Sequence, residues 1–375
     1  MLKKAVISLF FLVLLFVGIV LAISFFSKSQ KIEIFFKNQP DFGKALNIEN
    51  ATNKASQNPE LTLDQKIGQL FIVGIKGKKI NSETEDFIKS YHPGGILLLG
   101  ENIESEAQLK DLIFSLQKIA LNDTGLPLLI AADQEGGLIS RIKWAEKTPQ
   151  AKITDAAEAF SIAKKRGEDL AKDYIDLNFS PVLDDAADGD FVYSRTFQKS
   201  LYESGDMAKS IISGYKLSKV FSCIKHFPGY VGISFNPEDK LAVIDKIPEI
   251  SQFKKAAEAN PEFIMISNVV YKELDQTLPF SFLKSGIDFL KTNIPGGYIV
   301  ISDDLSQYSM LNNFSLEDVV FKPINAGIDM LIFSNWRKNS AEGMDAFKKA
   351  VESKKVSEDR INEAVSKIVK LKQKQ

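Results

Sequence analysis

The sequence is poor in cysteine and histidine, the side chains that most often form cross-links and bind transition metals. One cysteine and two histidines occur among 375 residues. A single cysteine, Cys223, excludes a disulfide within the chain and a thiolate-based zinc site. A centre with two imidazoles would need both His92 and His226, which lie far apart in the sequence. We therefore expect no metal centre.

An excess of charge of either sign is also missing. The chain has 47 Lys and Arg against 48 Asp and Glu, a formal net charge of −1. Such a chain has no global basic field to attract nucleic acid or anionic lipid. No local run of Lys and Arg with interleaved aromatic residues replaces that field. We therefore expect no nucleic-acid partner.

One long hydrophobic run is present, at the N-terminus. Lys3 and Lys4 precede an uncharged stretch from Ala5 to Phe26, which as a helix would span about 33 Å, enough for a bilayer core. Cleavable signal peptides have a shorter apolar core and a small-x-small cleavage site, neither of which fits here. A buried core helix is the alternative. We interpret residues 1–27 as a transmembrane signal anchor, with the lysines inside and the remaining chain exported.

A polar spacer is expected after this anchor. Residues 28–60 are rich in Ser, Asn, Gln and Lys and lack a sustained hydrophobic period. The folded body is expected over residues 61–375, with Thr62 as the cap of its first helix.

Short apolar runs and longer amphipathic stretches alternate through this body. The expected strands are Leu70–Ile75, Gly95–Leu99, Leu126–Ala132, Asn178–Leu183, Ser222–Lys225, Phe263–Ser267, Tyr298–Ser302 and Asp329–Phe333. Helical patterns between them include Ser105–Ile119, Ala156–Ile175, Tyr202–Leu217, Gln252–Ala259 and Leu316–Ala326. Strands that alternate with helices pair in parallel through right-handed crossovers.

The pattern predicts an α/β fold, a (β/α)8 TIM-type barrel. Near-continuous apolar strands are typical of sheets covered on both faces, and eight units fit the usual barrel size. An open doubly wound sheet would use the same units. Against it, no Gly-x-Gly-x-x-Gly follows the first strand.

Polar side chains follow most of the predicted strands. In a barrel, the carboxyl ends of the strands form one mouth, where active sites lie. Any one of these residues could be a helix cap or a solvated loop residue, but together they suit a polyhydroxylated substrate. They are Asp133 to Gly137, Asp184 and Asp185, Lys225 to Gly229, Asn268, Asp303 and Asp304, and Ser334 and Asn335.

Six motifs in order carry a resemblance to a known family. They are Asp133-Gln134-Glu135-Gly136-Gly137 with Arg141, Asn178 to Asp184, Arg195-Thr196-Phe197, Lys225-His226-Phe227-Pro228-Gly229, Ile301 to Leu305, and Asn325 to Leu331. In these stretches the chain resembles glycoside hydrolase family 3. The first and fourth motifs resemble its bacterial β-N-acetylhexosaminidase branch.

The resemblance implies a retaining glycosidase, in which a carboxylate attacks the anomeric carbon and water later releases the sugar. The family nucleophile falls on Asp303. Because side chains alternate along a strand, Asp304 is expected to point elsewhere and cap the following segment. This chemistry uses protein carboxylates alone, so the resemblance implies no cofactor and no metal.

The resemblance also implies sugar-binding residues. Asp133 would accept hydrogen bonds from sugar hydroxyls, and Lys225 and His226 would donate them. Arg141 and Arg195 complete the set, although Arg141 could instead form an ion pair with Asp133 at the barrel rim.

The chain departs from the family at the acid/base. The branch carries an Asp-Ser-His element after the Pro-Gly, whose histidine is the general acid/base. In an ungapped register from Lys225, Asn236 stands at the aspartate position and Glu238 at the histidine position. Glu238 is either the replacement acid, with its pKa raised by a neighbouring like charge such as Asp239, or a solvated loop residue.

Three functions follow. We expect a membrane-anchored, extracytoplasmic hydrolase that releases terminal β-linked N-acetylglucosamine from cell-wall or related glycans, and acts as a monomer. A glycan-binding pseudoenzyme that has lost its acid/base is the alternative. An unrelated barrel enzyme, such as an aldolase with a Schiff base on Lys225, is the third.

Overall fold

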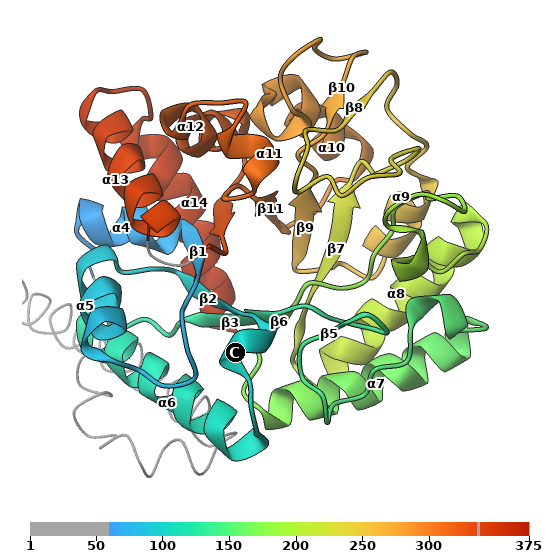
Figure 1. Cartoon of the computed structure of the whole chain (residues 1–375), viewed down its shortest axis with the longest axis horizontal. Helices are drawn as coiled ribbons and strands as arrows, with labels where there is room; N and C mark the ends of the chain where they lie inside the picture. Colours follow the sequence, from blue (N-terminus) through green and yellow to red (C-terminus); the bar gives the residue numbers. More distant parts are fainter. Residues whose placement is uncertain (1–59, 336–337, 375) are drawn as a thin grey trace, which may run out of the picture.

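Eight parallel strands close into a barrel in the computed structural model, which describes residues 60–335 and 338–374 (Figure 1). The strands pair in the order β1-β12-β11-β9-β7-β6-β3-β2, and β2 pairs with β1. The predicted barrel is confirmed, and the open sheet is excluded. The strands are β1 (Phe71–Gly74), β2 (Gly95–Leu98), β3 (Leu129–Ala132), β6 (Leu177–Asn178), β7 (Phe221–Phe227), β9 (Phe263–Ile266), β11 (Ile299–Asp304) and β12 (Met330–Phe333).

The fourth barrel strand differs from the expected range Asn178–Leu183. Regular pairing ends at Asn178, and Pro181 follows without an N–H to donate to a ladder. Contact with β7 resumes irregularly, as the Lys225 N–H donates to Pro181 O and the Leu183 N–H donates to Lys225 O. The apolar composition of residues 178–183 correctly predicted a buried segment, but it could not show that regular strand pairing is interrupted there.

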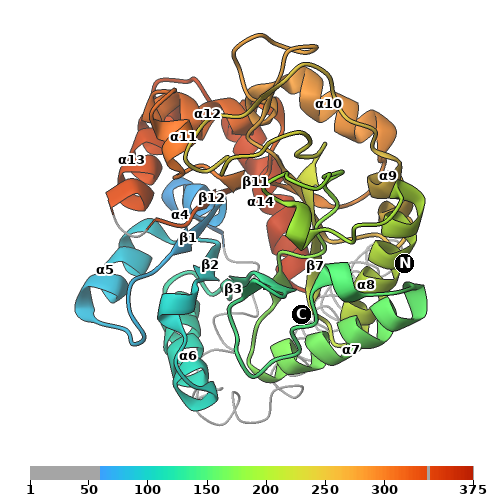
Figure 2. The same cartoon turned by 45° about the vertical axis from the view of Figure 1, so that its right-hand side comes forward.

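Helices surround the barrel in chain order (Figures 1 and 2). Thr62 forms a capping box on the first of them, as expected. The observed starts lie within one residue of the predicted ones for α6, α7, α8, α9 and α12. The helices are α4 (Leu63–Gln69), α5 (Ser82–Tyr91), α6 (Glu106–Asp123), α7 (Ala156–Lys172), α8 (Leu201–Leu217), α9 (Ser251–Ala257), α10 (Lys284–Asn293), α11 (Tyr308–Leu311), α12 (Leu316–Ala326), α13 (Lys338–Glu352) and α14 (Glu358–Lys372).

Two small sheets lie outside the barrel, in the segments that follow barrel strands. A hairpin of β4 (Gln134–Gly136) and β5 (Ile139–Ser140) comes directly after β3. A parallel pair joins β8 (Val243–Ile244), after β7, to β10 (Val270–Tyr271), after β9. Both therefore build on the mouth at the carboxyl ends of the strands.

The opposite end of the barrel contains a buried lysine. The Lys372 ammonium donates to Gln69 Oε1 at 2.7 Å, and the side chain lies beside Asp176, just before β6. Burial lowers the pKa of Lys372 to about 7, although the charge of Asp176 opposes it. Burial likewise raises the pKa of Asp176 to about 7, although the hydrogen bond from the Ile130 N–H and the charge of Lys372 both lower it.

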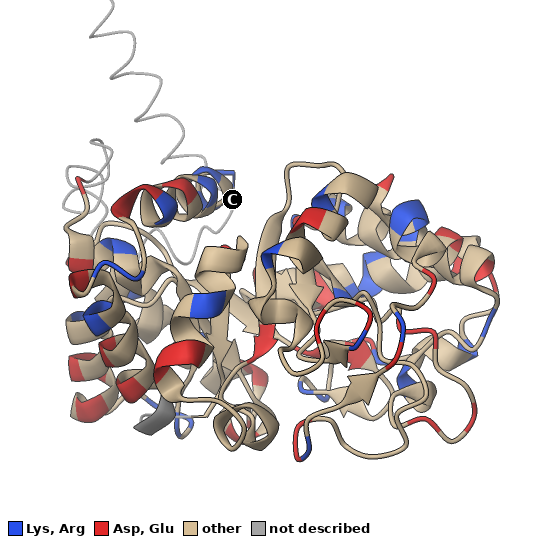
Figure 3. Ribbon diagram, turned by 90° about the horizontal axis from the view of Figure 1, so that it is seen from above, with Lys and Arg blue, Asp and Glu red and all other residues tan. Residues whose placement is uncertain are grey.

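The expected anchor over residues 1–27 lies outside the described residues, as does the expected spacer up to residue 59. Across residues 60–335 and 338–374, no helix has the length and apolar content needed to cross a bilayer. Lys and Arg are interspersed with Asp and Glu over the outer helices (Figure 3), in keeping with the small net charge.

Candidate active site

A cavity of about 290 Å³ opens at the carboxyl ends of the barrel strands. It is lined by all seven side chains predicted from the sequence, which the fold gathers from strands β7 and β11 and from the segments that follow β3, β6 and β7. These are Asp133, Arg141, Arg195, Lys225, His226, Glu238 and Asp303.

A network of buried charges forms one wall of this cavity. The Lys225 ammonium lies 2.7 Å from Asp133 Oδ1 and 2.6 Å from Glu135 Oε1. The Arg195 guanidinium holds Glu135 with two bonds, from Nε at 2.9 Å and from a terminal nitrogen at 2.8 Å. Charges buried in this way persist when each has a partner of opposite sign.

These partners decide the charge state of the network. Burial alone would raise the pKa of Glu135, but Arg195 and Lys225 outweigh it and lower the pKa to about 2. Burial would lower the pKa of Lys225, but Asp133 and Glu135 outweigh it and raise the pKa. Lys225 is therefore a charged donor. Schiff-base chemistry needs a neutral amine, so this geometry disfavours the aldolase hypothesis.

The His226 ring is oriented by Asp184, which the sequence analysis had identified only as a polar residue at a strand end. His226 Nδ1 lies 2.8 Å from Asp184 Oδ2, and the backbone N–H of Tyr230 donates to Asp184 Oδ1 at 2.8 Å. The rings of His226 and Tyr230 meet edge to face, with centroids 4.9 Å apart. With Nδ1 engaged, the other ring nitrogen of His226 is left for the cavity that the residue lines.

Asp303, at the end of β11, is held by three donors. The Tyr230 hydroxyl donates to its Oδ2 at 2.7 Å. Its Oδ1 accepts the Asp304 N–H at 2.7 Å and a long bond of 3.5 Å from Gln307 Nε2. Burial and the charge of Asp303 raise the pKa of Tyr230 well above its ordinary value, so the phenol keeps its proton and remains a donor.

Asp304 has the capping contacts expected of it. Its carboxylate accepts bonds from the backbone and hydroxyl of both Ser306 and Ser334. The expectation that it points away from the mouth is wrong, because Asp304 also lines the cavity. The register of β11 against β12 shifts between Ile301 and Asp304, and this irregularity breaks the alternation on which the expectation rested.

Glu238 lies in the loop after β7, where it lines the cavity and remains accessible to solvent. Its backbone is fixed, since its N–H donates to Asn236 Oδ1 and its carbonyl accepts the Ser309 N–H at 2.8 Å. Partial burial raises its pKa, and the negative charges of Asp303 and Asp304 raise it further, while Arg195 opposes them. Asp239, expected to supply the like charge, is not among these causes.

Arg141 does not form the ion pair with Asp133 that was considered at its sequence position. Asp133 pairs with Lys225 instead, and among the described residues the buried Arg141 Nε has no hydrogen-bond partner. Arg141 lines the cavity from the β5 side. An unpaired guanidinium nitrogen there suits a ligand oxygen.

The second histidine belongs to the other end of the molecule. His92 ends α5, and its Nδ1 lies 2.6 Å from Asp123 Oδ2. Within the described part of the chain, no group of three or more His, Cys, Asp or Glu side chains could hold a metal ion.

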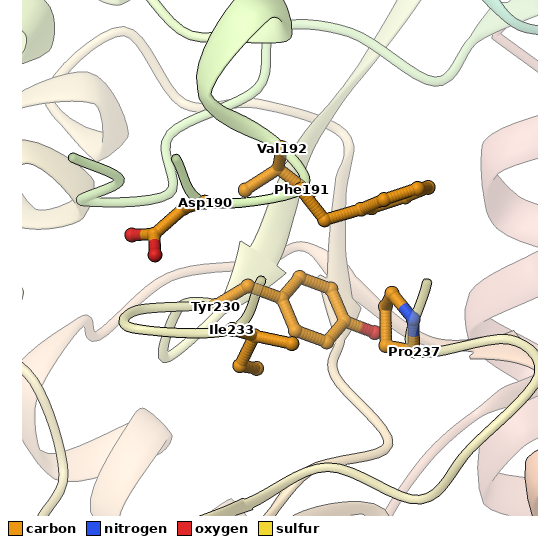
Figure 4. A pocket seen from close by; sticks show the side chains of 6 residues that line it. All are labelled: Asp190, Phe191, Val192, Tyr230, Ile233 and Pro237. Carbon is orange, nitrogen blue, oxygen red and sulfur yellow. The ribbon is translucent and has the colours of Figure 1, made fainter. Parts of the chain in front are cut away.

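A narrow crevice lies between the loops after β6 and β7, and it shares four lining residues with the cavity: Phe191, Val192, Tyr230 and Pro237. Figure 4 shows Phe191 and Val192 of the first loop on one side of this crevice, and Tyr230, Ile233 and Pro237 of the second loop on the other. The Phe191 N–H donates to Ile233 O at 2.7 Å, so the two loops are joined through their backbones.

Three residues of the site were missed at the sequence level. Glu135 lies two positions after Asp133, the spacing that returns an extended chain to the same face. Asp184 was recognised only as a polar strand-end residue, and Tyr230 was assigned no role. A pairing rule would have found Glu135, since buried Lys225 and Arg195 require carboxylate partners.

Comparison with known proteins gives concordant results. The model of the glycosyl hydrolase family 3 N terminal domain matches residues 62–371. A beta-hexosaminidase of Psychromonas ingrahamii is 30% identical over 298 residues, covering 74% of this chain and 86% of that protein.

Solved structures show the same similarity. A glycoside hydrolase family 3 beta-N-acetylglucosaminidase from Paenibacillus sp. str. FPU-7 superposes with a TM-score of 0.78 at 26% identity, covering 84% of this chain. The present chain spans only 62% of that longer protein. A beta-N-acetylhexosaminidase from Beutenbergia cavernae also gives a TM-score of 0.78 at 26% identity, covering 84% of this chain and 99% of that one.

Proposed function

Because the chain belongs to glycosyl hydrolase family 3 and is therefore a glycosidase, we propose that it is a retaining β-N-acetylhexosaminidase with a carboxylate acid/base. Its substrate would be a terminal β-linked N-acetylglucosamine of cell-wall or related glycans. The observation that carries the proposal is that two carboxylates, Asp303 and Glu238, line one cavity together with paired cationic donors.

In the first step, Asp303 attacks the anomeric carbon as the bond to the leaving oxygen breaks. Glu238 donates its proton to that oxygen, so the aglycone leaves as an alcohol and the sugar stays esterified to Asp303. The raised pKa of Glu238 supports this role, because an acid must hold its proton until the bond breaks.

In the second step, the Glu238 carboxylate removes a proton from water, whose oxygen attacks the anomeric carbon and releases Asp303. Configuration is retained because two inversions follow each other. Asp133, Lys225 and His226 would bind the sugar hydroxyls, and Arg141 and Arg195 would complete that wall. Each of these side chains except Arg141 is held by a partner from the protein, so the wall is formed before the sugar binds.

The sugar assignment rests on relatives. The similar proteins from Psychromonas, Paenibacillus and Beutenbergia are described as a beta-hexosaminidase, a beta-N-acetylglucosaminidase and a beta-N-acetylhexosaminidase. We carry the N-acetylglucosamine substrate over on that basis. The apolar run from Ala5 to Phe26 adds the proposal of an exported, membrane-anchored enzyme.

The test uses the full-length protein with a fluorogenic aryl β-N-acetylglucosaminide and a natural N-acetylglucosamine disaccharide. We expect both to be cleaved, and Asp303→Asn to abolish both activities. Glu238→Gln should reduce disaccharide cleavage by about 10²–10⁴-fold and spare more of the aryl reaction, whose leaving group needs less protonation.

Other outcomes would change the conclusion. Full disaccharide activity in Glu238→Gln would remove Glu238 from the mechanism. No cleavage of either substrate by the wild-type protein, with measurable sugar binding, would leave a glycan-binding pseudoenzyme.

A further inference from the structure

We propose that Phe191 forms the binding platform for the leaving-group sugar, on the outer side of the bond that is cleaved. This inference rests on the proposed function, whose residues bind only the sugar that Asp303 attacks. The ligand class is a β-linked disaccharide or longer glycan, in which a second pyranose ring occupies this platform.

Phe191 is unusual among the apolar residues of the cavity because its side chain is open to solvent. It is 42% exposed, whereas Phe179 and Val192 in the same lining are 1% and 2% exposed. Single exposed apolar residues are common on protein surfaces. An aromatic ring at the rim of a catalytic cavity has a more specific use, because it presents a flat apolar face where substrate enters.

The position of the ring assigns it to the leaving-group side. A general acid must reach the oxygen between the two sugars, so the leaving sugar lies next to Glu238. Pro237 precedes Glu238 in the chain, and Pro237 and Phe191 line the same crevice (Figure 4). The Lys225 network, which would bind the attacked sugar, lies deeper and is buried.

The backbone around Phe191 is fixed, which a binding platform requires. The Phe191 N–H donates to Ile233 O at 2.7 Å. The neighbouring Asp190 accepts the Gly232 N–H at 3.0 Å and the Ala187 N–H at 2.9 Å through one carboxylate oxygen. Because these bonds hold the loop before substrate arrives, binding would cost little further ordering.

The chemistry of the ring fits a pyranose. A β-linked hexopyranose carries axial C–H groups that form an apolar patch, and such a patch packs on the face of an aromatic ring. Phenylalanine offers this contact without a hydrogen-bonding group, so it would favour sugar rings without selecting particular hydroxyls.

The experiment measures binding in the full-length Asp303→Asn protein, where turnover is blocked, with and without Phe191→Ala. The probes are N-acetylglucosamine and its β-1,4-linked disaccharide. We expect Phe191→Ala to weaken disaccharide binding about 5- to 10-fold and to change monosaccharide binding less than about 2-fold. Phe191→Trp should restore disaccharide binding, and Phe160→Ala, an exposed phenylalanine on α7, should leave both affinities unchanged.

The outcomes separate the two proposals. Equal loss for both sugars, or no loss for either, would overturn the platform while leaving the hydrolase intact. If the wild-type protein cleaves neither substrate, but Phe191→Ala still weakens disaccharide binding selectively, the hydrolase proposal is overturned and the platform is retained. Binding of neither sugar would overturn both.

Discussion

At the scale of single residues, the site depends on charges that are buried only because they are paired. Glu135 forms ion pairs with both Lys225 and Arg195, and it is the carboxylate that the two cations share. Removing Glu135 leaves the Arg195 guanidinium without its carboxylate partner and leaves Lys225 with Asp133 alone, which costs more than the lost interactions themselves contribute.

Glu135→Gln should therefore lower the free energy of unfolding by about 3 kcal/mol at neutral pH. The folded-state pKa of about 2 lies below the ordinary value of 4.5, so this contribution is complete above pH 4.5 and disappears as the pH falls toward 2. Denaturant unfolding of both proteins at several pH values measures the difference. The exposed Glu101→Gln is the control, and an equal loss there would contradict the argument.

Tyr230→Phe removes the hydroxyl that donates to Asp303 Oδ2. We expect kcat/KM to fall about tenfold, mainly through kcat, because a hydrogen bond to a charged acceptor orients the attacking carboxylate. Steady-state kinetics on the aryl substrate check this. Tyr202→Phe, far more exposed on α8, is the control, and a change confined to KM would show that Tyr230 only binds substrate.

The pH dependence of the reaction should report Glu238. Its raised pKa places the basic limb of kcat/KM above the ordinary glutamate value of 4.5, since activity needs the protonated acid. Glu238→Gln should remove this limb, and Asp239→Asn should keep it. An unchanged limb in the glutamine variant would assign the titration to another group.

The sequence predicted which residues share the cavity but not what each one contacts. Strand ends must meet at one mouth in a barrel, so Asp133, Lys225 and Asp303 were expected together from topology alone. The partner of Arg141 could not be predicted in this way, because either Arg141 or Lys225 could have reached Asp133. Side-chain length and loop path decide that choice.

At the scale of elements, period and composition found all eight barrel strands because each is buried on both faces. They did not find the β4–β5 hairpin or the β8–β10 pair, whose strands of two or three residues are too short to show a period. They also overextended the fourth strand across Pro181.

The contact between β1 and β12 has no room for a side chain at Gly74. A Cβ there would lie 1.9 Å from Ser334 O, and Ser334 in turn holds Asp304. Gly74→Ala should lower stability by about 3 kcal/mol or more, because backbone must move to relieve the overlap. Thermal unfolding measures the loss. Gly100→Ala, with open space around it, is the matched control and should change little.

At the scale of the whole molecule, the end of the barrel opposite the cavity should govern stability in alkaline solution. Lys372 has a folded-state pKa of about 7 against an ordinary 10.5. The unfolded chain therefore binds more protons between these values, and Lys372 destabilises the fold increasingly as the pH falls from about 10.5 to 7.

Lys372→Met should gain stability relative to the wild type over that range, by on the order of 3 kcal/mol between pH 10 and pH 7. Loss of the bond to Gln69 shifts the whole curve without changing its slope. Urea unfolding across this range tests the slope, with the exposed Lys370→Met on the same helix as control. Parallel curves for Lys372→Met and wild type would refute the assignment.

The backbone hydrogen bond between Phe191 and Ile233 joins two segments that are 42 residues apart in sequence. We expect the two segments to evolve together, because each provides half of this contact. A loop graft that replaces only the segment after β6, or only the segment after β7, would separate one loop from the loop that it contacts. Recombination designed to alter leaving-group preference should therefore exchange both segments together, and natural substitutions in one should be accompanied by substitutions in the other.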